Sequence, residues 1–214
     1  EDDEDDYDED DYDFDDEDNL QITYLAKSNK NTEVNLTNHL YWNLHGEGSD
    51  KTILDHELKL NSSKVLEMDT VQIPTSKLLD VAGTPFDFSE WREFDRDIDS
   101  EFNIIRNFGG YDHCFAVDGY EKNILKEVGQ LRCKATGRKV TVLSSQPAAV
   151  LYTGNWLAGG CPKTKSDKYY QDYAGVAIEC QGFSDAVNHP DFPSIYLKAD
   201  ELYCNKIVFK LEQF

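Results

Sequence analysis

The sequence lacks the long apolar runs and the leader pattern that mark membrane and exported proteins. Its apolar stretches reach about five residues, far below the roughly 20 that a membrane-spanning helix needs. No cationic segment followed by an apolar one stands at the start, so no signal peptide is predicted. At 214 residues with 39 % hydrophobic content, the chain is expected to form one large domain without internal repeats.

Cysteine is also sparse, and its spacing is uninformative for metals. The five cysteines form an odd set without a CxxC pair, which argues against both a zinc site and a fully paired disulfide framework. A reducing compartment is therefore predicted, which indicates the cytoplasm. The alternative is an extracellular location, since Asn35 and Asn61 fit the glycosylation acceptor pattern.

Basic residues are missing from the first 18 positions, which hold 15 of the 42 acidic residues of the chain. That leaves 27 acidic against 21 basic residues in the remainder, an ordinary and mildly acidic balance. Residues 1–18 are predicted to be a disordered acidic tail that aids solubility. Sharper roles are weak calcium binding and tyrosine sulfation at Tyr7 or Tyr12. Neither part offers the basic stripe that nucleic acid binding requires.

From residue 19 onward the sequence consists of short β-branched and aromatic runs, separated by clusters of Gly, Pro, Asn and Asp. The runs are residues 21–25, 33–37, 56–60, 139–143, 149–152, 175–179 and 206–211. Only residues 88–98 predict a short helical turn, and no helical segment is long enough to connect parallel strands. Residues 19–214 are therefore expected to form an all-β, largely antiparallel β-sandwich.

Histidine, carboxylate and aromatic side chains gather in three segments, residues 38–43, 110–115 and 179–190. Each segment alone has a structural interpretation. His39 among aromatics is typical of a hydrogen-bonded core histidine, and Asp112 after two glycines is typical of a turn residue. Glu179 differs, because it is expected to end an apolar strand, where burial would raise the pKa of its carboxyl group.

Taken together, these side chains predict a sugar site on one face of the sandwich. Aromatic rings pack on the C–H faces of a pyranose, and carboxylates bind its hydroxyls. A glutamate base paired with a histidine acid can move two protons during one reaction. His39, His113 and His189 lack the spacing of metal ligands, so neither a metal site nor a cofactor is predicted.

Four ordered motifs carry a family resemblance. They are NLTNHLYWNL at residues 35–44, GYDHCF at 110–115, YTGNWL at 152–157 and ECQGFSDAVNHPDFP at 179–193. In this order and from residue 20 to the C-terminus, they resemble the signatures of the aldose 1-epimerases, or galactose mutarotases. The resemblance implies a β-sandwich of the galactose-mutarotase type. It also implies interconversion of the α and β anomers of a free hexose such as galactose or glucose.

The resemblance assigns roles residue by residue. Glu179 would be the general base that takes the proton of the anomeric hydroxyl, and His39 the general acid that protonates the ring oxygen. Asp112 would bind sugar hydroxyls. A carboxyl group of raised pKa suits a base that must deprotonate a poor acid.

The sequence also departs from the family pattern. It resembles the C-terminal three-fifths of the family's domain, with the acidic tail where the N-terminal strands would stand. The arginine and second histidine that those strands supply have no counterpart, and Val150 replaces a common glutamine. His45 follows the first motif directly and is interpreted as a loop residue. A partial sandwich is expected to expose an apolar face, so a partner chain that covers it is predicted.

Three hypotheses follow from the sequence. The first is an aldose 1-epimerase, whose activity as a partial chain is open. The second is a catalytically impaired mutarotase-like module that binds carbohydrate, favoured by the depleted binding residues. The third is an extracellular acidic protein whose tail binds calcium. The retained pair of Glu179 and His39 favours the first, because a binding module needs no acid–base pair.

Overall fold

The structure is a computed structural model that describes residues 11–14, 19–160 and 163–214. Its elements are almost all strands. They are β1 (Asp11–Phe14), β2 (Asn19–Lys27), β3 (Thr32–Glu33), β4 (Tyr41–Trp42), β5 (Glu57–Leu60), β6 (Lys64–Met68), β7 (Pro74–Asp80), β8 (Arg92–Glu93), β9 (Asp112–Ala116), β10 (Lys126–Cys133), β11 (Arg138–Ser144), β12 (Ala148–Tyr152), β13 (Val176–Gln181), β14 (Tyr196–Leu197) and β15 (Leu202–Gln213). The described residues also form three 3₁₀ helices, η1 (Phe94–Arg96), η2 (Phe102–Phe108) and η3 (Ala186–Asn188), and no α-helix.

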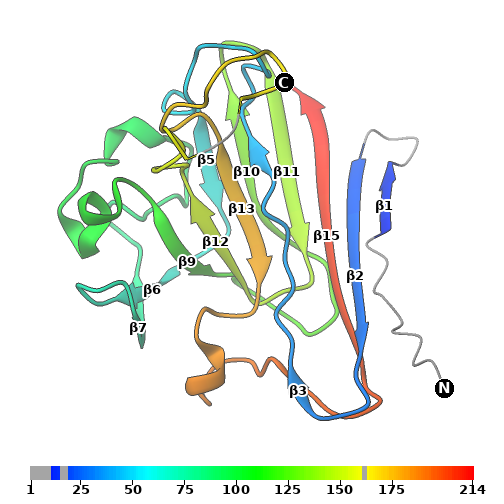
Figure 1. Cartoon of the computed structure of the whole chain (residues 1–214). Helices are drawn as coiled ribbons and strands as arrows, with labels where there is room; N and C mark the ends of the chain where they lie inside the picture. Colours follow the sequence, from blue (N-terminus) through cyan, green and yellow to red (C-terminus); the bar gives the residue numbers. More distant parts are fainter. Residues whose placement is uncertain (1–10, 15–18, 161–162) are drawn as a thin grey trace.

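Two antiparallel sheets make up the body of the molecule (Figure 1). The seven-stranded sheet has the order β1-β2-β15-β11-β10-β5-β8, and the six-stranded sheet has the order β4-β13-β12-β9-β6-β7. A separate two-stranded sheet pairs β14 with β3. Hairpins and longer returns connect antiparallel neighbours, so the fold needs no crossover helices. The predicted all-β, antiparallel sandwich is confirmed.

A single large apolar core joins the two sheets. Alternate residues of the strands point inward, such as Val142 and Phe209, which pair across β11 and β15. From the six-stranded sheet, Leu151 and Ile178 are a directly opposed pair, and both belong to the same core. Because side chains alternate along a strand, the other face of each strand carries a different set of residues, and on the six-stranded sheet these include a smaller apolar cluster with Leu66, Cys114 and Ala148. On the six-stranded sheet, that outer face carries the candidate site.

The strand predictions held for most of the chain. The runs at residues 21–25, 139–143, 149–152 and 206–211 lie within β2, β11, β12 and β15. All of 175–179 except Gly175 lies in β13, and most of 56–60 is β5. Residues 33–37 form a strand only at Glu33. Strands β6, β7, β9 and β10 were not among the predicted runs, because charged and small residues interrupt their alternation. The helical turn predicted within residues 88–98 is present as η1.

The acidic segment differs from its prediction at four residues. Asp11–Phe14 form strand β1, which pairs antiparallel with Leu20–Thr23 of β2 at the edge of the seven-stranded sheet (Figure 1). The predicted disorder over residues 1–18 is therefore wrong at β1. Main-chain groups make this pairing, so acidic side chains do not prevent it. Residues 1–10 and 15–18 lie outside the described residues, and the boundary at residue 18 stays a prediction.

Candidate active site

The strand register places the predicted site residues on one face of the six-stranded sheet. Glu179 of β13 is opposite Val150 of β12, and Tyr152, two residues further along β12, is opposite Asp112 of β9. Positions two apart on a strand share a face, so these four side chains lie on the same side. Strand β13 continues to Gln181, so Glu179 lies inside the strand and not at its end as predicted.

His39 approaches this face from the loop before β4. Its Nε2 lies 3.5 Å from Oε1 of Glu179. The imidazole ring packs against Tyr41 and Tyr152, with ring centroids 4.7 Å and 6.0 Å away, and the two tyrosine rings also contact each other. The side chain of His39 is 49 % exposed, while that of Glu179 is 14 % exposed. The pair therefore combines a largely buried carboxylate with a histidine that solvent and ligands can reach.

The two carboxyl groups of the site share an unusual electrostatic setting. Burial raises the pKa of Glu179; nearby His39 lowers it, and the negative charge of Asp112 raises it further. Burial likewise raises the pKa of Asp112, against a smaller lowering by His39. Each carboxyl thus binds a proton more readily than in water, because the apolar sheet solvates its anion poorly. Titratable groups with shifted pKa values that share one accessible face make this face a candidate functional site.

Side-chain anchors hold the loop that carries His39. Asn35 accepts a hydrogen bond from the backbone N–H of Gly182 (2.7 Å), and its own amide donates to the carbonyl of that residue. The hydroxyl of Thr37 donates to the carbonyl of Cys180 (2.9 Å). The amide of Asn205 bridges the carbonyls of Leu36 and Cys180. The segment thus runs alongside β13 without ladder pairing, which explains why residues 34–37 are not a strand.

A second set of anchors positions Asp112. The hydroxyl of Thr153 accepts a hydrogen bond from the N–H of Tyr111, and the amide of Asn155 donates to the carbonyl of Tyr111. Gly110 has φ +146°, and a Cβ there would lie 2.6 Å from Oδ1 of Asn155. Only glycine therefore fits this turn, which brings β9 into register beside β12. Residues of the YTGN motif thus hold the backbone of the GYDH motif in place.

His113 faces the opposite side of the sheet. It is 1 % exposed, lies among the rings of Phe86 and Phe108, and accepts the N–H of Asp112 at Nδ1. His189 pairs with Asp185, with 3.2 Å between Nε2 and Oδ2. The structure brings Glu179, His39 and Asp112 together and places these other two histidines elsewhere. Sequence reasoning did not single out Tyr41 and Tyr152 individually, although the aromatic motifs contain both.

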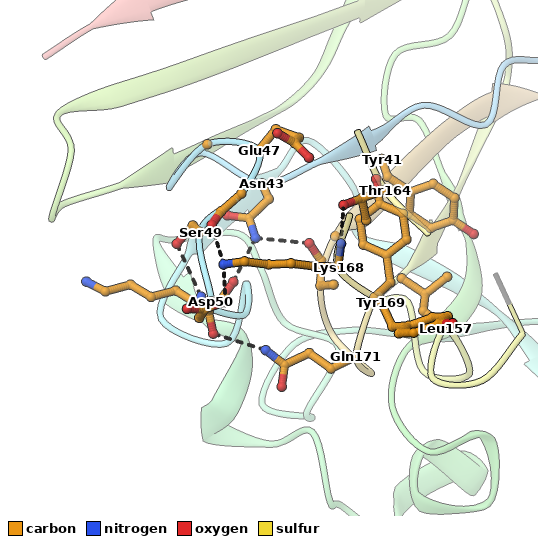
Figure 2. A pocket seen from close by; sticks show the side chains of 16 residues that line it. Tyr41, Asn43, Glu47, Ser49, Asp50, Leu157, Thr164, Lys168, Tyr169 and Gln171 are labelled. Atoms are coloured by element: carbon orange, nitrogen blue, oxygen red, sulfur yellow. Dashed lines mark hydrogen bonds and ion pairs between the residues drawn. The ribbon is translucent and has the colours of Figure 1, made fainter. Parts of the chain in front are cut away.

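A cavity of about 260 Å³ adjoins this face at Tyr41 (Figure 2). Its walls are the loop at residues 46–51 and the segment at residues 164–171. The polar groups in the walls largely bond to one another: Lys168 pairs with Asp50 at 2.7 Å, and Gln171 donates to the Asp50 carbonyl. His39, Glu179 and Asp112 do not line it. The cavity is thus a neighbour of the acid–base pair and shares the ring of Tyr41 with it.

Outside this face, the described residues include free thiols and one group of potential metal ligands. Cys114, Cys133, Cys180 and Cys204 are free thiols, and Cys161 lies outside the described residues. Within the described ranges, one group of side chains has the size of a metal site, and it shares no residue with the face around Glu179. None of the helices described is long and apolar enough to cross a membrane.

Comparison with known proteins connects this chain to a family. The aldose 1-epimerase family profile matches residues 11–210. Galactose mutarotase from Bos taurus is 37 % identical over 191 residues, which cover 89 % of this chain and 53 % of that protein. Aldose 1-epimerase from Escherichia coli K12 is 35 % identical over 192 residues, which cover 86 % and 52 %. The chain thus spans about half the length of the curated relatives it matches.

Solved structures agree with the sequence matches. The GalM/aldose epimerase homologue from C. elegans superposes with a TM-score of 0.79 at 26 % identity, covering 94 % of this chain and 58 % of that one. Galactose 1-epimerase from Lactobacillus acidophilus NCFM superposes with a TM-score of 0.75 at 26 % identity, covering 94 % and 55 %. Family profile, relatives and fold lead to one conclusion: this chain belongs to the aldose 1-epimerase family.

Proposed function

We propose that the chain interconverts the α and β anomers of a free hexose, such as galactose or glucose, by opening and closing the sugar ring. The observation that carries this proposal is the close pairing of His39 with Glu179 on an accessible face, 3.5 Å apart. The anomeric hydroxyl and the ring oxygen are both bonded to C1. An acid and a base that serve these two oxygens must therefore lie side by side, as this pair does.

In the proposed mechanism, Glu179 removes the proton of the anomeric hydroxyl while His39, as imidazolium, protonates the ring oxygen. The bond between C1 and the ring oxygen breaks and leaves an open-chain aldehyde. Rotation about the C1–C2 bond presents the other carbonyl face. His39 then takes the proton back from the hydroxyl as its oxygen attacks C1, and Glu179 returns a proton to the new anomeric oxygen. Both groups end in their starting states.

The surroundings of the pair support these roles. Burial is the largest cause of the raised pKa of Glu179. The raised value lies nearer to the pKa of the poorly acidic anomeric hydroxyl, so Glu179 is a better base for removing that proton. Asp112 shares the face and is the proposed ligand of sugar hydroxyls. Tyr41 and Tyr152 flank His39 and offer ring surfaces for the C–H groups of a pyranose. The relatives named galactose mutarotase and aldose 1-epimerase support this substrate class.

A carbohydrate-binding module without turnover is the second candidate. It is favoured by Val150, an apolar residue directly opposite Glu179 where many family members carry glutamine. Each missing hydrogen bond to a neutral hydroxyl weakens binding by about 0.5–1.5 kcal/mol. The intact acid–base pair supports the epimerase over this alternative.

The compartment and the partner chain are further parts of the proposal. The free thiols of the described cysteines support a cytoplasmic location. The side-chain amide of Asn35 bonds to Gly182 and that of Asn61 bonds to the Glu127 carbonyl, so glycans there would break existing contacts. A partner chain that covers part of the sandwich is a further proposal, which the exposed apolar side chains of Leu25 on β2 and Leu202 on β15 support.

Polarimetry on freshly dissolved α-D-galactose and α-D-glucose tests the activity with the purified 214-residue chain. We expect faster mutarotation than buffer, and a loss of about 10²–10⁴-fold in Glu179→Gln, because the amide keeps the shape but accepts no proton. Glu33→Gln, on exposed β3, is the matched control and should keep the rate. Sugar binding without acceleration by the unaltered chain would select the binding module, and equal rates in both variants would remove Glu179 from the mechanism.

A further inference from the structure

Four potential metal ligands meet away from the candidate active site. His45 lies in the loop after β4, Asp55 and His56 directly precede β5, and Cys133 ends β10. One ligand atom from each of the four lies within 4.8 Å of the others. His45 and Cys133 are 88 positions apart in the sequence, so only the fold brings them together.

A hydrogen-bond network fixes the chemical state of His56. The backbone N–H of Leu44 donates to Nε2 of His56 at 2.9 Å, so this nitrogen is the acceptor. The neutral ring therefore carries its proton on Nδ1, which lies 3.0 Å from Oδ1 of Asp55 and donates to it. With both nitrogens engaged, His56 orients the carboxylate of Asp55 and is not itself a ligand.

The remaining three groups are potential zinc ligands that lie close together. Nε2 of His45 lies 2.8 Å and 3.0 Å from the two carboxylate oxygens of Asp55. Sγ of Cys133 lies beside the same ring, 3.9 Å from Nε2 and 3.7 Å from Nδ1. Ligand atoms of a tetrahedral zinc site with ordinary Zn–N, Zn–O and Zn–S bonds are about 3.3–3.6 Å apart. A bound ion would therefore separate Nε2 and the carboxylate by about half an ångström more, and the imidazole would turn so that Nε2 faces the thiol. Imidazole, thiolate and carboxylate are also the ligand types that zinc prefers.

Burial and charge fit the same ion. The side chains of His45 and His56 are 3 % and 0 % exposed and Cys133 is fully buried, while the side chain of Asp55 is 53 % exposed. An ion thus has an entry path on the side of Asp55. A thiolate and a carboxylate balance the two positive charges of zinc, so the occupied site is neutral, as a buried site requires.

The protein holds the site's backbone in place. The carbonyl of Leu44 accepts hydrogen bonds from the hydroxyl of Thr136 and the guanidinium of Arg138. Both donors stand just after Cys133, so they tie the loop of His45 to the strand end that carries the thiol. Hydrogen bonds that hold the ligand-bearing segments in place increase the affinity of a site for its metal.

We propose that His45 Nε2, the carboxylate of Asp55 and the thiolate of Cys133 form a zinc site with an open fourth position. His56 orients Asp55 through its Nδ1–H. Binding releases the proton of the thiol, and His45 binds through Nε2 as a neutral imidazole whose one remaining proton is on Nδ1. The ion takes the place of the hydrogen bond between His45 and Asp55.

Isothermal titration of the full 214-residue chain with Zn²⁺, after treatment with chelator and reductant, tests the site. We expect one equivalent bound and a melting temperature that rises with zinc and returns after EDTA. Cys133→Ser should weaken binding by more than the about 10–100-fold that loss of an orienting residue causes. Cys204→Ser, an exposed thiol, is the matched control and should bind like the unaltered chain.

Two further measurements keep the proposal testable if Cys133→Ser fails to fold. Asp55→Asn changes a half-exposed side chain and should also weaken zinc binding strongly. Co²⁺ bound to the unaltered chain should show the ligand-field bands of low coordination and a thiolate charge-transfer band. A cobalt spectrum without the thiolate band, or equal zinc affinity in Asp55→Asn and the unaltered chain, would overturn the site.

Discussion

Two histidine–carboxylate pairs in this chain are built in opposite ways. In the first, His39 is half-exposed and Glu179 is largely buried, with 3.5 Å between Nε2 of His39 and Oε1 of Glu179. In the second, His45 is buried and Asp55 is half-exposed, with 2.8 Å between them. Burial raises the pKa of Glu179. Burial acts on Asp55 in the same direction, but hydrogen bonds from two histidines outweigh it and lower its pKa.

The difference shows what each arrangement is suited to do. A carboxylate with a raised pKa and an accessible histidine can exchange protons with a ligand that enters between them. A histidine sealed in the core and bonded to an anchored carboxylate has no room for such a ligand. Such a histidine–carboxylate pair can stabilise the local structure or bind a small ion. The same two residue types thus serve different chemistry, and burial of one partner or the other decides which.

The largest effect is expected at His39. His39→Ala should lower turnover by about 10²–10⁴-fold with little change in melting temperature, because its side chain is half-exposed. His113→Ala should lower turnover much less, but should cost about 2–5 kcal/mol of stability by opening a cavity beside Phe86 and Phe108. Polarimetry and thermal unfolding of both variants give the comparison. Equal turnover in the two would contradict the assigned role of His39.

An intermediate effect is expected at Val150. Val150→Gln places an amide opposite Glu179 in the register, where it can reach a sugar bound on this face. One added hydrogen bond should tighten sugar binding by about two- to tenfold, equivalent to about 0.5–1.5 kcal/mol. Calorimetric titration with galactose measures the gain, and Val150→Leu is the control of similar size without a donor. If both variants bind alike, the sugar does not lie over Val150.

A smaller effect, on stability, follows from the pKa of Glu179. Its folded-state pKa is raised above the ordinary 4.5, so the protonated form stabilises the fold and ionisation at neutral pH removes that stability. Glu179→Gln imitates the protonated form and should raise the melting temperature at pH 7. The gain should shrink as the pH falls through the raised pKa and vanish below 4.5.

The matched control for this experiment is Glu212, whose pKa is lowered by a hydrogen bond from Thr141 and by Lys139. Its stabilising contribution is present above pH 4.5 and is lost as the pH falls through its lowered pKa. Glu212→Gln should therefore lower the melting temperature slightly at pH 7. Shifts of the same sign in the two variants at pH 7 would mean that Glu179 is not held in a destabilising environment.

The smallest effect is expected from removal of the acidic tail. Deletion of residues 1–10 removes nine acidic side chains and should leave the affinity for a neutral hexose unchanged. Deletion of residues 1–14 also removes β1 and uncovers the edge of β2, so it should promote aggregation. Light scattering and sugar titration of both deletions separate these effects. A loss of sugar binding on deleting residues 1–10 would show that the tail reaches the site.

Local patterns made much of the fold predictable. Period-two alternation marked β2, β11, β12 and β15, since each has an apolar face and a polar one. Strands β6, β7, β9 and β10 were not predicted, because charged residues and a glycine at 129 break the alternation of apolar and polar residues in them. Strand β1 was not predicted for another reason. Its pairing depends on the free edge of β2, which no property of residues 11–14 reveals.

The sequence by itself determined the family, the all-β class and the candidate acid, base and sugar ligand, because motif order and residue chemistry are properties of the chain. Only the tertiary structure decided which neighbours share a face. Asp112 and His113 are adjacent in sequence but point to opposite sides of β9, since successive residues of a strand alternate. His45 and Cys133, far apart in sequence, meet because a loop folds back on the end of β10. Such contacts depend on strand register and loop path, which long-range packing sets.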